Sequence, residues 1–323
     1  MKKKKPARSK SEREHDHFFR GVFSVKEMAV AHLRDSLPAD LVADLQMEAL
    51  VLLSESYVDG DLKSNFSDVV WQCPLRLGGA VKITFLFEHK SDLPKQHISI
   101  QLLQYVLGIW KKDLANGSEM SFVVPVVVYH GQRKWSGRSL WEEFPGLPEP
   151  YRRFLPEMAY ILTDLNRVPD ELIKTKNDLG ALRSVYLAFK YAYDEVLLEQ
   201  NFRDIIIFVS RSGNVRLDTL LTEMVFSYVQ QRLQMMPEEL ENMIENLPDD
   251  SKSIAMSTYD KIIAKGIEKG IEKGIEKGIE LKTREFVIKL IHSTDWNDAR
   301  IALVAGVEEG LVREIRQQLQ QMS

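Results

Sequence analysis

The feature that most constrains the fold is a pair of apolar segments, DVVWQCPLRL and VKITFLFEH, on either side of Gly78 and Gly79. Side chains of a β-strand alternate between two faces, and in both segments every second residue is apolar, over 69–77 and over 81–87. Glycines permit a tight reversal between two strands. The segments are therefore predicted to form an antiparallel hairpin with one buried face.

The register of this hairpin decides which polar side chains lie together. A two-residue Gly-Gly loop would place Asp68 and Glu88 on opposite faces. A three-residue loop over 78–80 would pair Asp68 with Lys90 and would align the two apolar faces. Because burial of one face selects the register that aligns the apolar side chains, we predict the three-residue loop, with Asp68, Glu88 and Lys90 converging.

Further strands and helices are expected around the hairpin. Apolar spacing predicts a first helix, with one break, from an N-cap at Asp16 to Pro38, and another over 97–112. Strands are expected in MEALVLL, SFVVPVVVYHG and MAYILTDL, and Pro125 favours an edge or bulged position for the middle one. From Leu179 the pattern is mainly helical, with a surface connection over Pro237–Ser253.

The chain is expected to divide into five parts. A basic disordered tail precedes an α/β domain, and a helical extension, a repeat segment and a small helical hairpin follow, with boundaries at 1–13, 14–210, 211–260, 261–282 and 283–323. The hairpin, joined near Gly306, has the outline of a helix-turn-helix, although any small helical hairpin looks similar.

The repeat segment consists of four copies of KGIE over Lys265–Glu280, with isoleucines four residues apart. On an α-helix this stripe drifts by about 40° per repeat, and each glycine costs about 1 kcal/mol relative to alanine. Such a helix is weak by itself. Packing against a second copy would stabilise it, so a homodimer or higher homo-oligomer through the C-terminal region is expected, with a solvated spacer as the alternative.

Composition excludes several classes of protein. The formal net charge is −4, which argues against binding nucleic acid by bulk electrostatics, although the Lys2–Lys5 cluster could touch phosphates. Cys73 is the only cysteine, so an internal disulfide or a cysteine-rich zinc site is excluded and a cytoplasmic compartment fits. No apolar run reaches about 18 residues, so neither export nor membrane insertion is expected.

The polar face of the hairpin is the strongest candidate for chemistry. Two carboxylates, Asp68 and Glu88, on adjacent strands need a compensating cation, and hard oxygen ligands suit Mg²⁺ or Mn²⁺. Such a cation could bind a phosphate and activate a water, while Lys90 positioned the water or neutralised developing charge. Gln101 and Tyr105, one helical turn apart, could add hydrogen bonds to the same site.

Each of these residues also has an ordinary structural interpretation. A Glu-x-Lys pair at a strand end is usually a solvated ion pair, and Gln101 could be a helix-surface amide. Asp164 could contact the metal, but a turn or cap role is favoured, and His15 is expected to order the start of the first helix. There is no P-loop, GxGxxG or nucleophile elbow.

Several motifs in order resemble a known family. HDHFFRGVFS, LRDSLP, SYVDGDLKSNFSDVVW, FLFEHKS and ISIQLLQYVLGIW look like the bacterial recombination-promoting nuclease (Rpn) family, also labelled putative transposases, over about residues 14–210. That family is assigned to the PD-(D/E)XK nuclease superfamily. The resemblance implies a restriction-endonuclease-like mixed central sheet flanked by helices, with a mainly helical C-terminal extension.

The resemblance also implies roles for individual residues. Asp68 and Glu88 would be metal ligands, the backbone carbonyl of His89 a third ligand, Lys90 the catalytic lysine and Gln101 a supporting amide, with Mg²⁺ as cofactor and Mn²⁺ or Ca²⁺ as alternatives. One departure is that the proline–aspartate pair of the superfamily is Ser-Asp here.

The interpretation that follows is a bacterial, cytoplasmic, Mg²⁺-dependent DNA endonuclease that promotes recombination or mobile-element transfer. A DDE-type transposase is one alternative, although Lys90 on the core strand argues against it. A catalytically inactive DNA-binding or assembly protein with the same fold is the other.

Overall fold

The computed structural model describes residues 10–53, 69–76, 82–90, 97–135, 137, 139–175, 180–209, 214–233 and 235–321, and for 10–12, 82–90 and 321 it describes the backbone alone. The described chain is a mixed α/β protein. It divides into two compact units, the first ending at Thr258 and the second beginning at Tyr259.

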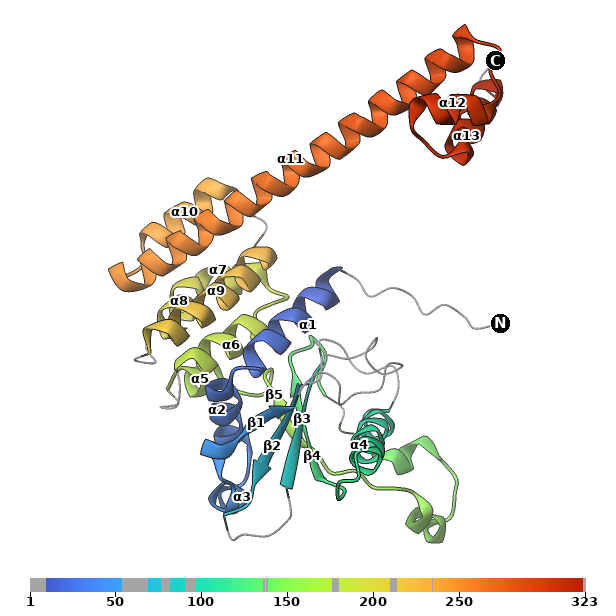
Figure 1. The fold of residues 1–323 in the computed structure, drawn as a ribbon. Coiled ribbons are helices and arrows are strands. Elements are labelled where there is room, and N and C mark those ends of the chain that lie inside the picture. The colour runs from blue at the N-terminus through green and yellow to red at the C-terminus, as the bar shows by residue number, and fades with distance from the viewer. Residues whose placement is uncertain are drawn as a thin grey trace. The chain divides into compact units, whose positions relative to one another are not determined.

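The first unit is built on a five-stranded mixed sheet whose strands lie in the order β1-β2-β3-β4-β5 (Figure 1). The strands β1, β2 and β3 pair antiparallel, whereas β3, β4 and β5 pair parallel. A parallel pair needs a crossover, and the helix α4 (Ile98–Ala115) supplies it between β3 and β4. The strands span Val51–Leu53, Val69–Pro74, Lys82–Lys90, Phe122–Tyr129 and Ile161–Asp164.

The hairpin of β2 and β3 forms as predicted, but its predicted register is wrong by two residues. The structure pairs Val69 with Phe87 and Pro74 with Lys82, whereas the three-residue loop would have paired Val69 with His89. A shift of two keeps every side chain on its face, because the period of a strand is two. The apolar pattern therefore determined which faces coincide and could not determine the register. Asp68 lies outside the described residues.

β4 is a central strand, so the edge position predicted from its proline is wrong. Its last four residues, Val126–Tyr129, are fully buried and pair with β3 on one side and β5 on the other. Pro125 pairs with Leu86 of β3, and the ladder with β5 begins only at Val126. The proline thus precedes the part of the strand that has neighbours on both sides, where a missing N–H is tolerated.

One face of the sheet is covered by α4 (Figure 1). The buried residues of this helix recur three or four positions apart, the spacing that forms one helical face. They pack against side chains from β2 and β4 and against Trp135. The members of this core cluster are Val70, Ile98, Leu102, Tyr105, Ile109, Val127, Tyr129 and Trp135.

The opposite face packs against the first helices. Trp71 of β2, next to Val70 but on the other face, donates from its indole nitrogen to the backbone carbonyl of Phe23 at 2.8 Å. Phe23 ends α1 (Lys10–Phe23), and α2 (Lys26–Ser36) follows after the predicted break and stops before Pro38 as expected. The predicted N-cap is wrong, because α1 begins at Lys10 and Asp16 lies inside the helix.

Further helices complete the first unit. Pro237–Ser253, expected as a connection, is instead α10 followed by the start of α11, because Pro237 stands at the first helical position, where a proline is tolerated. The remaining elements of the first unit are α3 (Ala39–Asp44), η1 (Met47–Ala49), η3 (Leu140–Glu143), η4 (Glu149–Phe154), α5 (Asp170–Thr175), α6 (Gly180–Lys190), α7 (Glu195–Gln200), α8 (Phe202–Val209), α9 (Val215–Arg232) and α10 (Pro237–Glu245).

α11 (Asp249–Ser293) continues through all four KGIE copies, so the repeat segment is helical. In the second unit, the end of this helix packs with α12 (Asp298–Ala305) and α13 (Glu309–Gln321) around Val287, Ile301 and Val312. Gly306, with φ +67°, turns the chain between α12 and α13. Within the described residues, no helix is both long enough and apolar enough to cross a membrane.

Candidate active site

The three residues at the centre of the predicted site are the last three of β3. Glu88 pairs with Val127 of β4, His89 with Val128 and Lys90 with Tyr129. The strand is extended to its end, as predicted, and it finishes at the same edge of the sheet as the parallel strand β4. Ligand sites of parallel sheets lie at this carboxyl edge.

The register assigns positions 88 and 90 of β3 to the face covered by α4. Residues that pair across neighbouring strands share a face, and the partners of these two positions, Val127 and Tyr129, pack in the core cluster with α4. Gln101 and Tyr105, the two helix residues predicted to join the site, are buried on the same helix, each 2% exposed. The interpretation of Gln101 as a helix-surface amide is therefore wrong.

Most of the predicted catalytic side chains lie outside the described part of the chain. Asp68 lies outside the described residues, and for Glu88, His89 and Lys90 the backbone alone is described. No three His, Cys, Asp or Glu side chains come together as a metal site among the residues with described side chains. The predicted ligands are outside that set, so the metal site stays a prediction.

Asp164 ends β5 in the same row as Lys90, since both residues pair with Tyr129. Its side chain interacts with two residues that follow it closely in the sequence, Asn166 and Arg167. One carboxylate oxygen accepts from the backbone N–H of Asn166 at 3.1 Å, and the other lies 3.4 Å from Nε of Arg167. This Asx turn is the structural role that the sequence favoured for Asp164.

The loop that follows β4 was not predicted as part of the site. Residues 132–134, Gln-Arg-Lys, are exposed between buried Gly131 and buried Trp135. The hydroxyl of Tyr129 donates to the backbone carbonyl of Arg133, so the loop folds back over the tyrosine that pairs with Lys90. The sequence signal that could have identified this loop is the pair of adjacent cationic residues between an apolar strand and a tryptophan.

The role predicted for His15, to order the start of the first helix, is wrong, because His15 lies within α1 and is 1% exposed. Its Nδ1 shares a 2.6 Å hydrogen bond with the hydroxyl of Tyr228 on α9, and its ring centroid lies 5.0 Å from that of His130. Burial raises the pKa of Tyr228 well above its ordinary value, so the phenol stays neutral. These contacts join α1 and α9 to the end of β4 on the face opposite α4.

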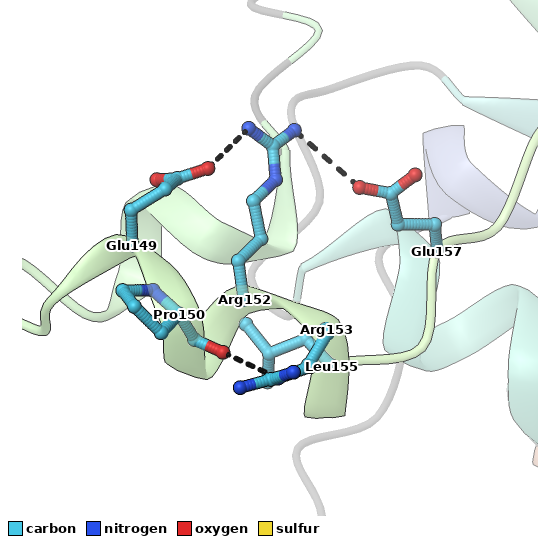
Figure 2. Close-up of a pocket in the computed structure, with 6 residues that line it drawn as sticks. All are labelled: Glu149, Pro150, Arg152, Arg153, Leu155 and Glu157. Carbon is cyan, nitrogen blue, oxygen red and sulfur yellow. Dashed lines mark hydrogen bonds and ion pairs between the residues drawn. The ribbon is translucent and has the colours of Figure 1, made fainter.

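A surface pocket of about 770 Å³ lies in the connection between β4 and β5 (Figure 2). Arg152 sits between two carboxylates, 3.5 Å from Glu149 and 3.4 Å from Glu157. Its charge is therefore compensated within the pocket. The described residues that line the pocket are Glu149, Pro150, Arg152, Arg153, Leu155 and Glu157, and Gln101 is not among them.

Known proteins resemble the chain over this region. RpnA of Escherichia coli (strain K12), a recombination-promoting nuclease, is 29% identical over 181 residues, which are 55% of this chain and 61% of RpnA. RpnD of Escherichia coli O157:H7, also named a recombination-promoting nuclease, is 27% identical over 163 residues, 49% of this chain and 61% of RpnD.

A third relative is named for the absence of activity. The inactive recombination-promoting nuclease-like protein RpnE of Escherichia coli (strain K12) is 28% identical over 174 residues, 53% of this chain and 57% of RpnE. The chain thus spans about three fifths of the length of these relatives. No solved structure matches the chain.

The family described as "Putative transposase, YhgA-like" matches residues 13–210, which contain the whole sheet and α4. This match covers more than half of the chain. Recombination-promoting nucleases are among the relatives of this chain. The chain therefore belongs to the family of YhgA-like putative transposases.

Proposed function

We propose that the protein is a metal-dependent DNA endonuclease whose first unit has a restriction-endonuclease-like, PD-(D/E)XK core. The observation that carries the proposal is the register at the end of β3, in which Glu88 and Lys90 pair with Val127 and Tyr129 on the α4 face. Asp68 immediately precedes β2 in the sequence, and β2 is the other neighbour of β3. We therefore propose that the side chains of Asp68, Glu88 and Lys90 lie together at this edge of the sheet.

The donor set fits a hard divalent cation. Carboxylates of Asp68 and Glu88, with the backbone carbonyl of His89, would supply only oxygen atoms, which suits Mg²⁺, with Mn²⁺ or Ca²⁺ as alternatives. When bound, such a cation would stabilise negative charge on a phosphate and lower the pKa of an attacking water.

The remaining residues would act through charge and position. The ammonium of Lys90 would donate to the water or to a non-bridging phosphate oxygen as negative charge develops there. Gln101, buried on the helix that covers this face, would hold the arrangement through its amide without touching the phosphate. Recombination-promoting nucleases among the relatives support DNA cleavage during recombination or mobile-element transfer as the cellular role.

Nicking of supercoiled plasmid with Mg²⁺ tests this proposal. Wild-type protein should nick the plasmid, and Glu88→Gln and Lys90→Gln should each lose about 100-fold or more, because each removes charge that acts in the transition state. Glu149→Gln, a surface change in the β4–β5 connection, serves as the matched control and should keep full activity. Undiminished cutting by Glu88→Gln would reject the site.

A non-catalytic DNA-binding or assembly role is the second candidate, because a relative with 28% identity is named inactive. Retained DNA binding by wild-type protein without any nicking would favour it. The family description also names transposases, and a DDE-type enzyme would join donor to target DNA. A strand-transfer product in a joining assay would replace the nuclease proposal.

We also propose that two copies associate through the KGIE helix. Ile267, Ile271, Ile275 and Ile279 are 58–62% exposed, and space around the intervening glycines is open. On a helix, successive residues are about 100° apart, so a glycine column borders the isoleucines on one side and a glutamate column on the other. In an antiparallel pair of helices, the glutamate column of one helix would face the glutamate column of the other, and the two would repel. In a parallel pair, the glutamate column of each helix would face the glycine column of the other. The parallel arrangement is therefore favoured.

A further inference from the structure

The loop after β4 carries a feature that the proposed nuclease site does not explain. We propose that Arg133 and Lys134 bind the sugar-phosphate backbone of the DNA substrate beside the reacting phosphate. This assignment rests on the proposed nuclease function and adds the residues that hold the substrate strand.

The backbone of the loop is fixed at several points. The hydroxyl of Tyr129 donates to the Arg133 carbonyl, and the side-chain amide of Asn166 donates to the Gly131 carbonyl. Trp135, only 4% exposed, closes the loop and donates from its indole nitrogen to the hydroxyl of Tyr160 at 3.0 Å. A loop held in this way presents its side chains from a defined position, which lowers the entropic cost of binding.

The two cationic side chains are exposed, and neither has an ion-pair partner among the described residues. Neither Arg133 nor Lys134 forms a side-chain hydrogen bond or an ion pair within the part of the chain that the structure describes. The whole chain carries 47 acidic and 43 basic residues. Two adjacent cations that have no acidic partner among the described residues are therefore notable. An exposed arginine next to a lysine is suited to phosphate, because both donate several charge-assisted hydrogen bonds.

The position of the loop links it to the proposed reaction site. Arg133 is held over Tyr129, and Tyr129 is the register partner of Lys90 on the adjacent strand. Neighbouring strands lie about 4.8 Å apart. Successive phosphates of one DNA strand are farther apart than two neighbouring β-strands. A DNA strand with one phosphate at Lys90 could therefore place its next phosphate within reach of the loop.

Two other arginines between the end of β4 and α5 are less suited to the role. Arg167 is held by Asp164 and by the Trp135 carbonyl, at 3.4 and 3.5 Å, and it supports the loop instead. Arg152 is paired with two glutamates. Among these cations, Arg133 and Lys134 alone lack an acidic partner among the described residues.

Fluorescence anisotropy with a short labelled DNA duplex, in EDTA so that the duplex is not cut, tests the assignment over a series of salt concentrations. The test variant is Arg133→Gln/Lys134→Gln, which keeps the backbone carbonyl used by Tyr129. The matched control, Arg34→Gln/Lys111→Gln, removes the same charge from exposed positions on α2 and near the far end of α4. Circular dichroism confirms that both fold, and plasmid nicking with Mg²⁺ is measured in parallel.

We expect the test variant to bind roughly tenfold more weakly than the control, with a salt slope reduced by about 2, one for each lost phosphate contact. If wild-type protein cuts DNA and the test variant binds like the control, the assignment of the loop is wrong while the nuclease proposal stands. If wild-type protein neither binds nor cuts DNA, both fall. Tighter binding to an RNA duplex would overturn DNA as the ligand.

Discussion

The hydroxyl of Tyr129 donates a hydrogen bond to the backbone carbonyl of Arg133, across the turn at the end of β4. Tyr129→Phe removes this donor and leaves a carbonyl without its partner. We expect a loss of about 1 kcal/mol in the free energy of unfolding and weaker DNA binding, because the loop is no longer held. Urea unfolding and anisotropy measure the two effects.

The control for this change is Tyr151→Phe, since Tyr151 is 56% exposed on the β4–β5 connection. It should match wild type in both assays. A Tyr129→Phe protein with wild-type stability would show that the hydrogen bond does not hold the loop.

The buried hydrogen bond between His15 and Tyr228 ties α1 to α9. Tyr228→Phe keeps the ring, which stacks on Phe18 at 4.1 Å between centroids, and removes only the hydroxyl. Because it leaves a buried imidazole nitrogen without this partner, we expect the free energy of unfolding to fall by about 1–3 kcal/mol. Denaturant unfolding against the Tyr151→Phe control measures it, and a change of less than about 0.5 kcal/mol would contradict the structural role of His15.

Asp170 gives a pH-dependent prediction. Burial raises its pKa, but hydrogen bonds from Lys190 and Tyr191 outweigh burial, so the pKa is lowered overall. A lowered folded-state pKa contributes stability above the unfolded pKa of about 4, and that contribution is lost as the pH falls through the folded value.

Asp170→Asn should therefore destabilise the protein at pH 7 by about 1 kcal/mol, a modest effect because the Asp170 side chain is 41% exposed. The difference from wild type should shrink as the pH falls below about 4. Thermal unfolding at a series of pH values measures the difference, and a constant gap between the two proteins would refute the linkage. Glu171→Gln, an exposed neighbour, is the control.

The KGIE helix gives a prediction about assembly. Deletion of Lys265–Glu280 should reduce the mass in sedimentation velocity from that of an oligomer to that of a monomer, because it removes the exposed isoleucine stripe. The same mass for both proteins would reject association through the repeat. Ile267→Asp/Ile275→Asp, which keeps the chain length, should act like the deletion.

Disulfide trapping distinguishes the two orientations of the helix pair. In a parallel pair, Ile271→Cys lies against its own counterpart and should cross-link under mild oxidation. A mixture of Ile267→Cys and Ile279→Cys should not form the mixed disulfide, because these positions are about 18 Å apart along the helix. Efficient formation of that mixed disulfide would indicate an antiparallel pair. Native Cys73 is buried, and burial raises its pKa to about 11, so it should not interfere.

Much of the sheet could be predicted from the sequence, because its strands have clear apolar patterns. The alternation over 69–77 and 81–87 identified a hairpin and its faces, and the run before Asp164 identified a strand that ends there. The register could not be derived, since a shift of two residues leaves every side chain on its face. The position of β4 was misjudged because Pro125 lies at the part of the strand that β5 does not reach.

The part of the candidate site that could be predicted is the part that local sequence patterns encode. Glu88, Lys90 and Gln101 could be assigned to a strand end and a covering helix, and the described backbone and the burial of Gln101 agree with those placements. The loop of Arg133 and Lys134 could not be found, because its position depends on hydrogen bonds to Tyr129 and Asn166. Such contacts between distant residues are a property of the folded chain and leave no periodic signal.

We propose that Asp68, Glu88 and the His89 carbonyl hold a divalent cation at the end of β3. Anomalous diffraction from crystals soaked in Mn²⁺ tests it most directly. We expect one Mn²⁺ peak bonded to both carboxylates at about 2.2 Å, with the Lys90 ammonium nearby. No Mn²⁺ at these residues, or an Asp68 side chain on the opposite face of the sheet from Glu88, would contradict it.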